Sequence, residues 1–206
     1  MNITLQNIGK KFNTEWIFRG VDCMFAENSA SAILGRNGSG KSTLLQVIAG
    51  NIHPSSGKVS YVHKGLSIPD TEVFRYLSLV APYQELIEDF DLQEMLAFHF
   101  SFKPMLPGFT YSRITELLGF SGSLHKQIRQ FSSGMKQRVK LVTAILSDVP
   151  LLLLDEPTMN LDNAGIEWYH KLISDFAGSR TLIICSNLHQ TESGFAKTSL
   201  QIEDYK

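Results

Sequence analysis

The stretch GRNGSGKST, residues 35–43, decides how the rest of the sequence is interpreted. It matches the spacing GxxxxGK[ST], in which glycines let the backbone curl so that several N–H groups converge on phosphates. Lys41 can reach the outer phosphate oxygens, and the hydroxyl of Ser42 can bind Mg²⁺. A helix expected from Ser42 to Ala49 would direct its positive end at the same anion. The stretch therefore predicts a nucleotide phosphate site, formed by Gly35, Asn37, Gly38, Ser39, Gly40, Lys41, Ser42 and Thr43.

The segments around this loop follow the order of an α/β protein. The alternation in ITLQNI and WIFRGVDCMF predicts short N-terminal strands, and SAILG predicts a strand that runs into the loop. Late in the chain LLLL and LIIC are fully apolar, as in buried parallel strands, and EWYHKLISDF between them has helical spacing. These five segments are residues 3–8, 16–25, 31–35, 151–154 and 182–185, with the helix at 167–176.

The middle of the sequence has a different character. Helical spacing in LQEMLAFHF and SRITELLGF, with few β-branched runs, predicts a helical lobe over approximately 84–142. We therefore expect one domain over residues 1–206, with a nucleotide-binding core at 1–83 and 143–206 and the helical lobe inserted between them.

Composition excludes several classes of function. There are 19 basic and 20 acidic residues, and no Lys/Arg run is longer than Lys10 and Lys11, so no nucleic acid partner is expected. Cys23 and Cys185 lie in apolar segments without metal-ligand spacing, which indicates buried thiols in a reducing compartment. The N-terminus lacks a signal-peptide core, and the apolar runs are shorter than the roughly 18–20 residues that span a bilayer. We expect a cytoplasmic protein with at most a peripheral membrane role.

Two carboxylates follow the apolar strand at 151–154. Asp155 and Glu156 stand at its C-terminal end, where open α/β sheets place their ligand sites. Asp155 can hold Mg²⁺, and Glu156 can orient or deprotonate a water aimed at a γ-phosphate. Taken alone, such a pair fits a solvated strand end equally well. Combined with the loop at 35–43, it predicts nucleotide hydrolysis.

The segment FSSGMKQRVKL, residues 131–141, has the pattern of a helix N-terminus. Ser132 and Ser133 supply capping hydroxyls, and Gly134 permits close approach. An apolar stripe of Met135, Val139, Val142 and Ile145 follows. Such an end can bind an anion, although an ordinary capped helix explains the segment as well.

The order GRNGSGKST, FSSGMKQR, LLLLDEPT and MNLD resembles ABC-type ATPases over essentially the whole chain. The family's usual signature is LSGGQ, so Ser133 and Met135 replace the common Gly and Gln. The resemblance implies a P-loop NTPase core with a mainly parallel central sheet, an N-terminal antiparallel β subdomain and an inserted helical lobe. It also implies ATP and Mg²⁺, and a homodimer or heterodimer of ATPase subunits. In that dimer Ser132, Ser133, Gly134 and Met135 contact the ATP held by the opposite subunit.

Three further positions take roles from the same resemblance. Phe12 stands where an aromatic ring stacks on adenine, although a buried strand Phe is the simpler alternative. Asp162 in MNLD would lie near the partner's phosphate loop, and an N-cap role before the next helix fits the sequence equally. Gln84 is the candidate for contact with Mg²⁺ and the attacking water, although counting places the expected position nearer Pro82 or Tyr83.

The family's switch histidine is replaced. Alignment of the last core strand puts Asn187 at its position, and His189 would reach the site only if the loop shifts. Asn can donate a hydrogen bond to a γ-phosphate but does not change charge near neutral pH as His does. Slower hydrolysis, or dependence on a competent partner site, is the hypothesis that this replacement motivates.

We therefore expect an ATP-binding and hydrolysing subunit of an ABC transporter, which drives a separate membrane permease through ATP-dependent dimerisation at the cytoplasmic face. By size the chain is similar to subunits of small exporters, including those for haem used in cytochrome c maturation. Two alternatives remain open: a soluble ABC ATPase, for example of the iron-sulfur assembly type, and a weakly hydrolytic regulatory subunit. A P-loop kinase or GTPase fits poorly because no [NT]KxD motif occurs. The transported molecule and the direction of transport stay open.

Overall fold

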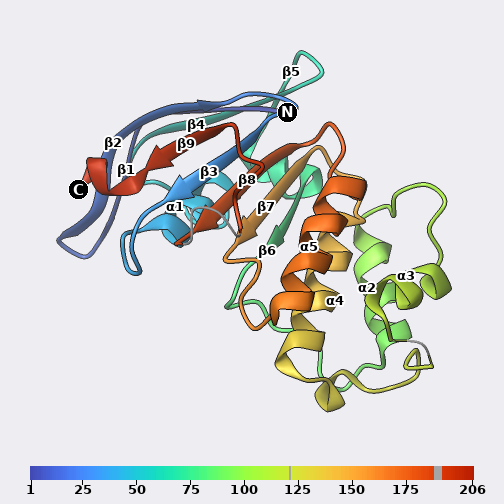
Figure 1. The fold of residues 1–206 in the computed structure, drawn as a ribbon. Helices are drawn as coiled ribbons and strands as arrows, with labels where there is room; N and C mark the ends of the chain where they lie inside the picture. Colours follow the sequence, from blue (N-terminus) through green and yellow to red (C-terminus); the bar gives the residue numbers. More distant parts are fainter. Residues whose placement is uncertain (121, 188–191) are drawn as a thin grey trace. The chain divides into compact units, whose positions relative to one another are not determined.

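The computed structural model describes residues 1–120, 122–187 and 192–206. Contacts divide the chain into two compact units, whose helices and strands are labelled in Figure 1. The first consists of Met1–Ala81, Pro150–Glu156 and Ser179–Lys206. The second consists of Pro82–Val149 and Pro157–Gly178.

A five-stranded parallel sheet forms the centre of the first unit, in the order β6-β7-β8-β3-β9. Its middle strands are apolar and buried along their length, as expected for a sheet covered on both faces. The predicted mainly parallel sheet is confirmed. The strands are β3 (Ala30–Leu34), β6 (Leu77–Val80), β7 (Leu151–Asp155), β8 (Thr181–Ser186) and β9 (Thr198–Gln201).

A second, antiparallel sheet has the order β2-β1-β4-β5. It confirms the predicted N-terminal antiparallel subdomain, but sequence analysis missed the hairpin of β4 and β5. Lys64 and Gly65 at the turn both have positive φ, 51° and 78°, as a type I′ two-residue turn requires. Gly65 suits this conformation, but Lys64 is not a residue that indicates it in a sequence. The strands are β1 (Asn2–Phe12), β2 (Glu15–Phe25), β4 (Ser56–His63) and β5 (Leu66–Ile68).

Helix α1 (Lys41–Ile48) joins the two sheets of this unit. It contacts β1 of the antiparallel sheet and β7 and β8 of the parallel sheet. Its side chains Leu44, Leu45 and Ile48 are fully buried in a cluster that also includes residues of both sheets. The short helices η1 (Asp70–Tyr76) and η3 (Ile202–Tyr205) complete the unit. The position of the loop at 35–43 is thus fixed by a helix that packs on two sheets.

The second unit is helical. Helix α4 (Ser133–Ile145) contacts α2 (Leu92–Phe102), α3 (Tyr111–Leu118) and α5 (Asn163–Phe176), and η2 (Ile128–Gln130) precedes it. Asp91 starts α2 through a capping box with Glu94. The lobe predicted at approximately 84–142 lies inside this unit, which also contains α5.

No helix within residues 1–120, 122–187 and 192–206 is both long and apolar enough to cross a membrane. Both cysteines are free thiols; Cys185 is fully buried and Cys23 half-buried.

Candidate nucleotide site

The loop at 35–43 connects β3 to α1, and its shape depends on glycine. Gly40 is the N-cap of α1 with φ of 107°, a conformation that side-chain-bearing residues rarely adopt. A Cβ at Gly40 would lie 2.8 Å from Cγ2 of Ile17 and 3.1 Å from Cδ1 of Phe18. The loop therefore packs directly against β2. Asn37 and Gly38 are exposed, Ser39 is buried, and Thr43 lies half-buried in the first turn of α1.

Lys41 is held inside this loop. Only 4% of the residue is exposed. Its ammonium group donates to the carbonyl oxygens of Gly35 at 2.9 Å and Arg36 at 3.0 Å, and to Oδ1 of Asn187. The charge is thus surrounded by oxygens at the point where the loop's N–H groups and α1 favour an anion.

Asp155 ends β7 and is fully buried. Neither of its carboxylate oxygens has a hydrogen-bond partner among the described residues. Burial raises the pKa of this carboxyl to about 6, and the negative charge of Glu156 adds to the increase. The nearby Ser42 hydroxyl and the positive charge of Lys41 act in the opposite direction and lower the pKa. A buried carboxylate without a partner is costly unless a cation compensates it.

The donor set of Ser42 and Asp155 fits Mg²⁺. The described residues contain no group of three or more His, Cys, Asp or Glu placed to hold a metal ion. Mg²⁺ does not need such a group, because it is commonly held by one or two protein oxygens together with phosphate and water. A bound Mg²⁺ would therefore explain why the carboxylate oxygens of Asp155 have no hydrogen-bond partner among the described residues.

Glu156 leaves the sheet in an unusual conformation. Its φ is 45°, and its backbone N–H donates to the carbonyl oxygen of Cys185 at 3.0 Å. A residue other than glycine in this region costs free energy, and such residues cluster at functional sites. The half-buried carboxylate accepts from Nδ2 of Asn187 at 2.7 Å. Sequence analysis predicted that Glu156 stands at the C-terminal end of this strand, but it did not predict the positive φ.

Asn187 follows β8 directly and contacts both Lys41 and Glu156. The residue before it, Ser186, is buried and forms a hydrogen bond with the carboxylate of Glu192, which is 4% exposed. Sequence analysis missed Glu192, because TESGF has no apolar pattern and matches no motif. His189 lies outside the described residues.

The predicted adenine platform lies at the β1–β2 turn. Phe12 ends β1 and is 50% exposed, so it is not the buried strand residue that we considered as the alternative. Lys10 Nζ lies 5.0 Å from the centre of its ring. Trp16, on β2, is also exposed, and Lys11 Nζ lies 5.6 Å from its ring. Both rings can stack on a planar group.

The second unit holds the other predicted residues. Ser132 is the N-cap of α4, and its hydroxyl accepts from the N–H of Met135 at 3.2 Å. Ser133 is exposed, and a Cβ at Gly134 would lie 3.0 Å from the carbonyl oxygen of Asn160. Of the expected apolar stripe, Val139, Val142 and Ile145 are buried and Met135 is half-buried. The apolar side of α4 is therefore buried, whereas the serines at its N-terminus are exposed to solvent.

Two predicted residues of this unit have defined local roles. Asp162 is the N-cap of α5 and accepts from the N–H of Gly165 at 2.8 Å. Gln84 is half-buried, and its backbone carbonyl oxygen accepts from Lys140 Nζ at 3.2 Å. These contacts give Asp162 a capping role and connect the backbone at Gln84 to α4.

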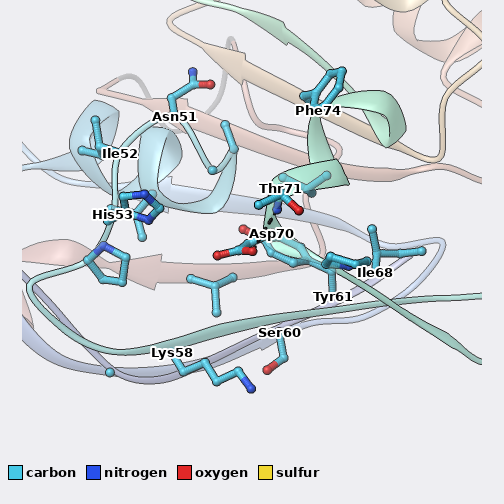
Figure 2. A pocket seen from close by; sticks show the side chains of 18 of the residues that line it. Asn51, Ile52, His53, Lys58, Ser60, Tyr61, Ile68, Asp70, Thr71 and Phe74 are labelled. Carbon is cyan, nitrogen blue, oxygen red and sulfur yellow. Dashed lines mark hydrogen bonds between the residues drawn. The ribbon is translucent and has the colours of Figure 1, made fainter.

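A separate cleft of about 780 Å³ lies where α1 ends, lined by residues of β4 and η1 (Figure 2). The Tyr61 hydroxyl donates to the carbonyl oxygen of Ile48, and the Asp70 carboxylate accepts from the N–H of Thr71. The cleft contains none of the residues predicted for the phosphate site, which lie at the opposite end of α1.

The sequence profile of the family described as "ABC transporter" matches residues 18–159. The chain belongs to the ABC transporter family. It is 29% identical over 195 residues to the cytochrome c biogenesis ATP-binding export protein CcmA of Agrobacterium fabrum, covering 92% of this chain and 90% of that protein. It is 32% identical to the protein of the same name from Rhodopseudomonas palustris, covering 82% of this chain and 83% of that one. A bacterial ABC transporter cassette with a dimeric structure shares the fold, with a TM-score of 0.78, 24% identity and coverage of 98% and 95%.

Gly40 offers a test of the loop geometry, with Gly38 as a matched control. Both have positive φ, 107° and 74°, but a Cβ at Gly38 would meet no atom within 4 Å. We expect Gly38→Ala to cost about 1 kcal/mol of unfolding free energy, from the backbone alone. Gly40→Ala adds overlap with β2 and should cost about 3 kcal/mol and abolish nucleotide binding. Urea denaturation and nucleotide titration measure both, and equal effects of the two substitutions would contradict this geometry.

Proposed function

We propose that this chain is the ATP-binding and hydrolysing subunit of an ABC transporter. The observation that carries the proposal is the meeting of Lys41, Glu156 and Asn187, through hydrogen bonds, at the ends of the adjacent parallel strands β7 and β8. Buried beside them, the carboxylate oxygens of Asp155 have no hydrogen-bond partner by distance and angle among the described residues. A phosphate loop, a carboxylate for a cation and a second carboxylate for water are what phosphoryl transfer to water needs.

In this proposal the loop binds ATP by its phosphates. Lys41 and the N–H groups at the start of α1 hold the β- and γ-phosphate oxygens. Ser42 and Asp155 hold Mg²⁺, which when bound neutralises charge on the phosphates. Exposed Phe12 stacks on the adenine, with Trp16 nearby as a second ring.

Glu156 is the proposed base. Its carboxylate stands one residue beyond Asp155, so it can accept a proton from water that attacks the γ-phosphate. Asn187 can donate to the γ-phosphate through its amide. For Gln84 we propose contact with Mg²⁺ and the attacking water.

A second copy of this chain would complete the site. Ser132, Ser133, Gly134 and Met135 form a capped, solvent-facing helix end, which suits a γ-phosphate brought by another molecule. Asp162 would approach the partner's phosphate loop. The dimeric cassette of the same fold supports this arrangement. Two chains would then enclose two ATP molecules, and ATP hydrolysis would let the two chains separate.

The helical unit presents a candidate surface for a membrane permease. Phe90, Phe98 and Phe102 form an aromatic ladder, with successive ring centres 5.7 and 5.1 Å apart, in which Phe98 is 43% and Phe102 73% exposed. Five acidic residues precede or begin α2: Glu85, Glu88, Asp89, Asp91 and Glu94. Cytoplasmic loops of membrane proteins are rich in Lys and Arg, so exposed rings next to these acidic residues in the sequence suit a permease loop.

The relatives favour the transporter over the soluble alternative. Two relatives named as export proteins cover 92% and 82% of this chain. We therefore propose export as the direction of transport and a peripheral location at the cytoplasmic face of a membrane. In this proposal the permease determines which molecule is transported.

Replacing the proposed base tests hydrolysis. Glu156→Gln should lower ATP turnover about 100-fold or more while ATP binding persists, because the amide cannot accept the proton. Glu167→Gln, an exposed position on α5, is the matched control and should retain wild-type turnover. Phosphate release measures both. Equal rates for wild type and Glu156→Gln would sink the assignment of Glu156, and binding without any wild-type turnover would favour a regulatory subunit.

The aromatic ladder predicts where the permease binds. Phe98→Ser with Phe102→Ser should abolish recovery of an apolar partner from solubilised membranes, while ATP binding is unchanged. Leu66→Ser, which removes a side chain that is 70% exposed in the other unit, controls for loss of apolar surface. Membrane recovery undiminished by the paired Phe substitutions would exclude this surface.

A further inference from the structure

The side chain of Asn187 links the two chemical groups of the proposed ATP site. Its Oδ1 accepts from the ammonium of Lys41, and its Nδ2 donates to Oε1 of Glu156 at 2.7 Å. An ammonium group only donates and a carboxylate only accepts, so the neighbours fix the direction of the amide. Asn187 thus neutralises no charge itself but joins a buried cation to a half-buried anion.

This bridge occupies Lys41 fully. The ammonium has three N–H donors, and three protein oxygens accept from it: the carbonyls of Gly35 and Arg36 and Oδ1 of Asn187. A phosphate oxygen that binds Lys41 must displace one of them. Two belong to the backbone of the loop, whose curl depends on Gly40 and Gly35. The amide of Asn187 can move by side-chain rotation alone, so it is the acceptor that phosphate displaces at the lowest cost.

The three residues are anchored to the same strand end. Ser186 fixes the end of β8 through Glu192, and the N–H of Glu156 donates to the carbonyl of Cys185. The Cys185 thiol lies 3.5 Å from the carbonyl oxygen of Lys41 and donates to it. The bridge from Lys41 through Asn187 to Glu156 is therefore held in place by contacts with Cys185 and Ser186 of β8.

We propose that Asn187 is a positioning residue that competes with nucleotide phosphate for Lys41 and holds Glu156 until phosphate arrives. This inference rests on the proposed function and adds a regulation of the same site. When phosphate takes Lys41, Oδ1 of Asn187 loses its cation, and the amide can turn its N–H groups toward the new anion. Glu156 then loses its donor and becomes free to accept from water. Phosphate binding and release of the base become one exchange, without a change of charge on residue 187.

Nucleotide affinity tests this competition directly. We would titrate ADP, with EDTA present, into wild type, Asn187→Leu and Asn187→Asp. Leu has the branched side-chain shape of Asn, with the same number of heavy atoms, but no acceptor, so ADP should bind about 3- to 10-fold tighter. Asp offers Lys41 a full negative charge, so ADP should bind at least about tenfold weaker than to wild type. Asn51→Leu, exposed beyond the far end of α1, is the matched control and should leave affinity unchanged.

A double-mutant cycle separates competition from damage to the fold. In a Lys41→Ala background the same substitutions at Asn187 should change ADP affinity less than twofold, because nothing remains to compete for. A purely structural role would weaken binding in both Asn187 variants, whereas the bridge predicts opposite signs. Tighter binding by Asn187→Leu that disappears in Lys41→Ala supports the inference. Equal or weaker binding by Asn187→Leu in an otherwise binding-competent protein overturns it, and failure of wild type to bind ADP or ATP overturns the proposed function as well.

Discussion

The buried ammonium of Lys41 is the interaction on which the site depends. Removing a charge from water costs several kcal/mol unless oxygens or an opposite charge replace the water. Here the loop curls so that two of its own carbonyls receive the ammonium, and β8 supplies a third oxygen through Asn187. The glycines of the loop and the packing of α1 between two sheets serve this arrangement. The same features leave the loop suited to phosphate.

Around this cation the acidic residues divide into two roles because their environments differ. Asp155 is sealed inside the sheet edge, where burial raises its pKa, so it favours a cation close by. Glu156 turns out of the sheet with a positive φ and is half-buried, where a water molecule can reach it. In the proposed function Asp155 would hold a metal ion and Glu156 would face a water, as hydrolysis of a phosphate bond requires.

The parallel sheet, the antiparallel N-terminal sheet and the start of α4 were predictable because they depend on local signals. Apolar runs at β7 and β8, alternation along β1 and β2, and a capping serine at position 132 each act within a few residues. The β4–β5 hairpin was missed because its turn places Lys64 at positive φ, a conformation that a lysine in the sequence does not indicate. The Asn187 bridge could not be predicted, because it joins residues 146 and 31 positions apart through side-chain rotamers that only the packed sheet edge selects. Glu192 could not be predicted either, because it belongs to no motif and its burial depends on its contact with Ser186.

In the proposed function, ATP held at Lys41 draws a second cassette onto it through the helix end at Ser132. Sedimentation velocity of the Glu156→Gln chain, with and without Mg²⁺ and ATP, tests this most directly, because ATP persists when hydrolysis is blocked. The account predicts a monomer without nucleotide and a doubled mass with ATP, with no doubling when Ser132→Arg is added. A chain that binds ATP at saturation yet sediments as a monomer would contradict it.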